Sequence, residues 1–239
     1  MDAPPVLSLD LLHELEKRWR RQQAPVLDCL RPGLSVGELD GLMAPVGLRL
    51  PAEAHVWWGW HDGADAGPGT LARDRQIGGP GFQFLPLAEA IEQYERNRRI
   101  AEAVADRMPE SPADLADPWR WWDPGGFPIT VSAAGAVVMC DTTVPQGAVA
   151  PIRARLAGEP ATAGARSFGE MVNWWIEALD SAAWRFDTHT LVIGTTTTTA
   201  WTQRESSPAS SDATQGRSIS LPSSAVTPNA THLRFRVIR

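Results

Sequence analysis

The pentapeptide Gly33-Leu34-Ser35-Val36-Gly37 matches the G-x-S-x-G pattern of hydrolases. In those enzymes the serine lies on a sharp turn directly after a buried strand, which exposes its hydroxyl as a nucleophile. The residues before it, Cys29 to Pro32, make a poor strand. Glu38 follows three residues after Ser35, a spacing typical of a helix capping box. We therefore expect Ser35 to be an N-cap, and a serine hydrolase that uses Ser35 is the alternative.

Side chains that bind metal ions gather near residue 60. His55 and His61 are six residues apart, so on one helix they point about 240° apart and cannot share an ion. Asp62 and Asp65 surround a glycine in a pattern typical of a turn that ends a helix. The sequence thus predicts no metal site here.

An acidic segment with aromatic residues covers residues 106–123. Tryptophan anchors surrounded by carboxylates are typical of protein-binding surfaces, where the charge guides the encounter and the ring supplies contact area. The alternative is a solvated loop whose tryptophans cover the core. The candidate protein-binding residues are Asp62, Asp65, Asp114, Asp117, Trp119, Trp121 and Asp123.

A short aromatic helix is expected between Leu50-Pro51 and Asp62-Gly63. It carries Trp57, Trp58 and Trp60, three of eleven tryptophans in the chain. Adjacent helical positions diverge by about 100°, so these rings cannot all face one core. Either one of them reaches a surface or an interface, or neighbouring elements wrap both sides of the helix.

Periodicity and breakers predict the remaining elements. Apolar residues at helical spacing predict helices over 8–23 and from Pro86 to Met108, and capping boxes at Ser35 and Ser167 predict two more. Short β-branched runs with tight turns predict an antiparallel meander. Its strands cover 127–132, 136–141 and 148–155, and a separate short strand is expected over 82–85. This order indicates an α+β fold, with helices packed around a mostly antiparallel sheet.

The composition changes sharply near residue 190. Five consecutive threonines lead into a Ser/Thr-rich tract that lacks the apolar residues needed to offset ordering entropy. We therefore divide the chain into an N-terminal helix (1–29), an α+β domain (30–190) and a disordered low-complexity tail (191–239).

The charge balance restricts the class of partner. The chain has 22 basic and 28 acidic residues, a net charge of −6. Nucleic-acid binding requires clustered Lys and Arg, so we expect no nucleic-acid partner. The sequence predicts no membrane span and no secretion signal. Two cysteines far apart in sequence indicate free thiols, and we expect a cytoplasmic protein.

An ordered set of short motifs resembles the SUKH superfamily, which contains fungal cell-wall-synthesis regulators and bacterial toxin-immunity proteins. Leu50-Pro51 followed by Trp57-Trp58-Gly59-Trp60-His61-Asp62-Gly63 is similar to its "Leu-Pro, aromatic, Asn/Asp-Gly" signature. Phe84-Leu85-Pro86-Leu87 resembles its junction between strand and helix. The central strand from Gly135 to Asp141, Ala150-Pro151-Ile152, Trp174-Trp175 and Trp184-Arg185-Phe186-Asp187 follow in order. The resemblance covers residues 30–187.

The resemblance implies an α+β fold without catalytic residues or cofactor. For bacterial members it implies one-to-one neutralisation of a cognate toxin. We therefore expect a non-enzymatic immunity protein that occludes the active site of a basic toxin, a nuclease being the example that the charge favours. A regulatory scaffold, as in the fungal members, is the alternative besides the serine hydrolase.

Overall fold

The computed structural model describes residues 2–65, 72–77, 81–107, 123–155, 162–187 and 190–193. The helices in these ranges are α1 (Leu9–Arg21), η1 (Pro25–Asp28), α2 (Val36–Met43), η2 (Ala44–Val46), α3 (Ala52–Trp60), η3 (Ala72–Arg75), α4 (Leu87–Arg107) and α6 (Phe168–Asp180). The strands are β1 (Phe82–Phe84), β2 (Gly126–Ser132), β3 (Val137–Asp141), β4 (Ile152–Arg155), β5 (Thr162–Ala163), β6 (Trp184–Asp187) and β7 (Thr190–Ile193).

The predicted α+β class and antiparallel meander are confirmed. Strands β1 to β5 form one sheet in sequence order, and each neighbouring pair is antiparallel. All five residues of β3 are buried, which is the pattern of a central strand covered on both faces. The last predicted strand is shorter than expected, because β4 begins at Ile152 directly after Pro151.

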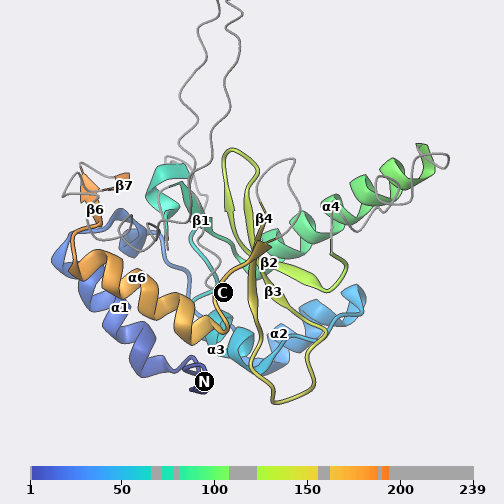
Figure 1. Cartoon of the computed structure of the whole chain (residues 1–239), viewed down its shortest axis with the longest axis horizontal. Helices are drawn as coiled ribbons and strands as arrows, with labels where there is room; N and C mark the ends of the chain where they lie inside the picture. The colour runs from blue at the N-terminus through green and yellow to red at the C-terminus, as the bar shows by residue number, and fades with distance from the viewer. Residues whose placement is uncertain are drawn as a thin grey trace, which may run out of the picture.

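Helices surround this sheet and share one core with it (Figure 1). Helix α4 packs on β2, and α1 packs on α6 and α3. Leu12, Leu15 and Trp19 of α1 belong to the same hydrophobic cluster as the sheet residues. The predicted N-terminal helix is therefore an integral part of this core.

Two serine caps fix the starts of α2 and α6. At α2 the predicted capping box is complete, since Ser35 accepts from the backbone of Glu38 and Glu38 accepts from that of Ser35. At α6, Ser167 accepts from the N–H of Glu170 at 2.8 Å. The reciprocal bond differs from the prediction, because the Glu170 carboxylate accepts from the N–H of Arg166 instead. The Arg166 side chain also pairs with Glu170, which draws the carboxylate away from the cap.

A separate hairpin follows α6. Strands β6 and β7 pair antiparallel from Trp184 with Ile193 to Asp187 with Thr190. Residues 191–193, which the sequence assigned to the tail, thus form a strand. The rest of the predicted tail, residues 194–239, lies outside the described residues.

Candidate functional site

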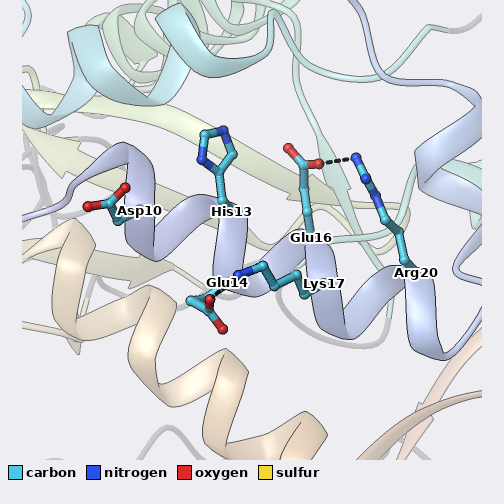
Figure 2. A pocket seen from close by; sticks show the side chains of 6 residues that line it. All are labelled: Asp10, His13, Glu14, Glu16, Lys17 and Arg20. Atoms are coloured by element: carbon cyan, nitrogen blue, oxygen red, sulfur yellow. Dashed lines mark hydrogen bonds and ion pairs between the residues drawn. The ribbon is translucent and has the colours of Figure 1, made fainter.

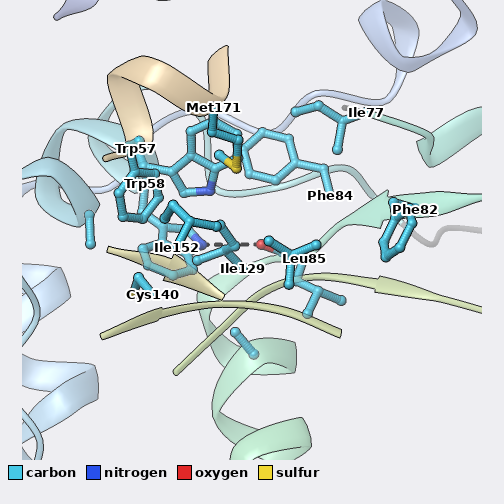
Figure 3. Close-up of a cluster of buried hydrophobic side chains, with 14 of the residues drawn as sticks. Trp57, Trp58, Ile77, Phe82, Phe84, Leu85, Ile129, Cys140, Ile152 and Met171 are labelled. Atoms are coloured by element: carbon cyan, nitrogen blue, oxygen red, sulfur yellow. Dashed lines mark hydrogen bonds between the residues drawn. The ribbon is translucent and has the colours of Figure 1, made fainter. Parts of the chain in front are cut away.

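The aromatic helix α3 is enclosed on both sides. Trp57 and Trp58 are fully buried and Trp60 is 7% exposed. The ring of Trp57 packs against that of Phe84 in a tilted arrangement with 4.8 Å between ring centroids, and Trp58 donates to the carbonyl of Leu85 at 3.1 Å (Figure 3). Of the two possibilities that the sequence left open, neighbouring elements wrapping the helix is the one observed. These rings build the core and leave no exposed aromatic anchor on α3.

Asp62, a candidate binding carboxylate, faces the interior. Its Oδ1 accepts from the N–H of Leu87 at 2.7 Å, and its Oδ2 pairs with Arg31 at 3.0 Å. It therefore caps the first turn of α4 from outside that helix. Burial raises the pKa of Asp62, while the bond from Leu87 and the charge of Arg31 act against the rise. Asp62, one of the candidate protein-binding residues, is 4% exposed and its carboxylate contacts groups within the fold.

Asp65 lies close by in sequence but on the surface. Its side chain is exposed, and its backbone N–H donates to the carbonyl of Cys29 at 2.7 Å. The structure therefore separates the roles of the two residues, with Asp62 inside and Asp65 outside. Cys29 and Cys140 form no disulfide bond, and burial raises the pKa of Cys140.

A second buried carboxylate, Glu16 of α1, meets the end of α3. Glu16 Oε1 accepts from Trp60 Nε1 at 2.6 Å and lies 3.2 Å from His61 Nε2. Burial acts to raise the pKa of Glu16, but the bonds from Trp60 and His61 together lower it below its ordinary value. The other His61 nitrogen lies 2.9 Å from the carbonyl of Arg31. Both ring nitrogens thus lie within hydrogen-bond distance of oxygen atoms.

Glu16 also lines an open cavity of about 570 Å³ along α1 (Figure 2). The described lining residues are Asp10, His13, Glu14, Glu16, Lys17 and Arg20, all from this one helix. Hydrogen bonds from Lys17 and Arg18 lower the pKa of Glu14. General acid catalysis needs a carboxyl that stays protonated near neutral pH, so neither Glu14 nor Glu16 suits that role.

Asp123 is the one acidic candidate of the 106–123 segment that the structure describes. It pairs with Arg153 of β4, which also pairs with Asp141 of β3 at 2.7 Å. Its Oδ1 accepts from the N–H of Gly125 at 2.9 Å. Asp123 therefore ties the entry of β2 to the neighbouring strands. The other candidates of this segment, Asp114, Asp117, Trp119 and Trp121, lie outside the described residues.

Ser35 has the structural role that its spacing predicts. Its hydroxyl donates to Glu38 Oε2 at 2.7 Å and accepts from the N–H of Glu38 at 3.3 Å. Residues 31–34 form no strand. Leu34 instead donates its N–H to the carbonyl of Trp58 at 2.9 Å, which satisfies a free carbonyl at the end of α3. The strand that a nucleophile elbow requires before its serine is thus missing from this turn.

Helix α2 presents a surface that the sequence reading overlooked. Only Leu39 and Met43 of this helix are buried. The α2 face, as we name its remaining positions, consists of Val36, Gly37, Glu38, Asp40, Gly41 and Leu42, all exposed. Val36, Leu39 and Met43 follow the i, i+3, i+7 spacing of one helical stripe and Leu42 lies beside it, so the sequence pattern gives no signal for the exposure of Val36 and Leu42.

Metal sites and membrane-spanning helices are two further features to consider within the described residues. No group of three His, Cys, Asp or Glu side chains among them is placed to hold a metal ion. None of the helices within these ranges has the length and apolar character needed to cross a membrane. Comparison with protein-family models and with curated proteins finds no match to this chain.

Proposed function

We propose that this chain is a non-enzymatic protein-binding module, an immunity protein that neutralises a basic toxin by covering its active site. The observation that carries the proposal is the contrast between interior and surface. Asp62, Glu16 and Asp123 are bound to partners within the fold. The α2 face, by contrast, exposes Val36 and Leu42 together with Glu38 and Asp40, whose carboxylates contact Ser35 and His55 at the surface and remain exposed. Exposed apolar groups flanked by charge are typical of protein interfaces.

The net charge of −6 and the motif order add support. An acidic protein accelerates its encounter with a basic partner, and a basic toxin that acts on nucleic acid is such a partner. The motifs that resemble the SUKH superfamily imply the same function. A cytoplasmic location belongs to this proposal, because the toxin of such a pair acts on the cell that makes it.

The test begins with capture of a partner by the full chain from lysate of the source cells. The captured protein is then expressed alone in a bacterial host and together with the chain. We expect growth arrest by the partner alone, growth restored by the chain, and a one-to-one complex. Several weak partners without toxicity would favour the regulatory scaffold instead, and a toxic partner that the chain fails to neutralise would contradict immunity.

The predicted acidic segment can be tested with the same partner. Replacing Asp114 and Asp117 by alanine slows association if this segment guides the encounter. Asp123 is left unchanged, because its loss would also remove the ion pair with Arg153. An unchanged association rate would exclude these two carboxylates from the encounter.

A further inference from the structure

The proposed function leaves open where the partner docks, and helix α2 offers an answer. Figure 1 shows this helix at the outer edge of the fold, away from α1 and α6. Its side chains Val36 and Leu42 are 63% and 40% exposed. An exposed residue of this size is unremarkable by itself, but two on a helix of eight residues leave much of its surface apolar.

Glycines occupy the centre of this surface. At about 100° per residue, Gly37 and Gly41 point directly away from the buried pair Leu39 and Met43. Asp40 and Glu38 then border the two glycines, and Val36 and Leu42 lie further round the helix, beyond these carboxylates. The surface is therefore a shallow strip of backbone with a carboxylate along each border.

The fold gives no reason for these two glycines. A Cβ at Gly33, Gly63 or Gly169 would meet backbone atoms within 2.4 Å. A Cβ at Gly37 or Gly41 meets nothing within 4 Å, and neither residue has a positive φ. Glycine inside a helix weakens it relative to alanine. Two such residues on an exposed face fit a surface that another chain approaches closely.

The charge of the α2 face indicates the charge of the partner segment that would bind it. Glu38 and Asp40 are exposed, and residues 32–48 contain no lysine or arginine. Hydrogen bonds from Ser35 lower the pKa of Glu38, which keeps its carboxylate ionised. The side chain of Asp40 is 70% exposed and lies 3.4 Å from His55 Nε2. A partner segment on this strip thus meets two negative groups and no lysine or arginine of α2.

We propose that the α2 face is the surface on which the toxin docks, through a segment with small or apolar side chains over Gly37 and Gly41 and Lys or Arg beside Glu38 and Asp40. This inference rests on the proposed function, because it names the docking surface of that same activity. Its occupant is a basic protein, and the fit follows from opposite charge together with close approach.

The experiment measures binding of the captured partner, purified, to variants of the full chain by calorimetry. Gly41→Gln places a side chain in the middle of the strip, and we expect the Kd to rise at least tenfold. The matched control is Ala103→Gln on α4, which adds the same side chain at another exposed helical position. We expect no change in Kd for the control.

Charge is tested separately with Asp40→Asn. We expect this variant to associate several-fold more slowly at low salt, with the difference disappearing at high salt. If the association rate of the wild-type chain did not fall as the salt concentration rises, the proposal that a basic protein binds the α2 face would be contradicted.

The outcomes separate this inference from the function on which it rests. If the partner is neutralised by Gly41→Gln as well as by the wild-type chain, with equal Kd, the α2 face is not the docking surface and the immunity function stands. If the wild-type chain captures no partner or neutralises none, the function fails and the inference fails with it. An unfolding midpoint of Gly41→Gln that is not below that of the wild-type chain shows that the fold is intact.

Discussion

Asp62 and Glu16 are two buried carboxylates whose pKa values the fold shifts in opposite directions. The pKa of Asp62 is raised, chiefly by burial, so its folded form disfavours the charge. The stability that Asp62 contributes is fully present at a pH below the ordinary Asp pKa of about 3.9. It is lost as the pH rises through the raised pKa of the folded state. Asp62→Asn keeps an oxygen for the N–H of Leu87 and removes this loss. We therefore expect the stability of the variant, relative to wild type, to improve as the pH rises above about 4, measured by urea unfolding with tryptophan fluorescence.

A second substitution separates charge from hydrogen bonding. Asp62→Ala leaves the N–H of Leu87 buried without an acceptor, which costs about 1–3 kcal/mol at every pH. If Asp62→Asn instead lost stability relative to wild type as the pH rose, the ion pair with Arg31 would dominate over burial, contrary to our expectation.

Glu16 shows the opposite pH dependence. Its pKa is lowered in the folded state, so its contribution is present above the ordinary Glu value of about 4.3 and is lost as the pH falls through the lowered value. Glu16→Gln keeps an oxygen for Trp60 but removes the charge beside His61 and Arg20. We expect a loss of about 1–3 kcal/mol at pH 6 that shrinks on acidification, because charged hydrogen bonds are worth about that much. A difference that stays constant down to pH 3.5 would contradict this assignment.

At the scale of elements, the structure distinguishes glycines that the fold requires from glycines that could be replaced by a larger residue. A Cβ at Gly33 would lie 1.9 Å from the carbonyl oxygen of Gly59 and 2.9 Å from that of Trp60. Gly33→Ala therefore forces residues 30–34 away from the end of α3, and we expect a loss of about 1–3 kcal/mol. Gly41→Ala on α2 meets open space, and we expect a gain of about 0.5–1 kcal/mol. Urea unfolding of the two variants measures both, and equal effects would contradict the distinction.

The elements that the sequence predicted correctly are those governed by local chemistry. The serine caps, the prolines and the apolar period define α1, α2, α4 and α6 and most of the meander. Strands β5, β6 and β7 were missed: β5 has only two residues, and the β6–β7 hairpin lies where the change in composition near residue 190 predicted the start of the tail. The contacts of Asp62 and Asp123 could not be predicted from local sequence either. Their acidity was visible in the sequence, but their partners Leu87 and Arg153 lie 25 and 30 residues away.

At the scale of the molecule, three segments distant in sequence meet at Glu53 of α3. Its Oε1 accepts from the N–H of Leu7 at 2.8 Å and from that of Gly169 at 3.2 Å. The N-terminal segment and the start of α6 are thus fastened to the aromatic helix through one carboxylate oxygen. Arg18 and Asp180 pair at the other end of α1 and α6, 3.1 Å apart. These contacts make the first helix part of a single cooperative unit.

Trp19 provides the test of that cooperativity. Its ring is 1% exposed and lies 5.8 Å from the ring of Trp60. Trp19→Ala leaves a large cavity between α1 and α3, and we expect a loss of about 3–5 kcal/mol. The matched control, Leu9→Ala at a 51% exposed position of the same helix, should change stability by about 0.5 kcal/mol or less. In one cooperative unit, fluorescence and far-UV circular dichroism report a single transition at a lower urea concentration in Trp19→Ala. If residues 1–29 were an appendage, the main transition would keep the midpoint of the wild-type chain, because the remaining core would unfold independently of α1.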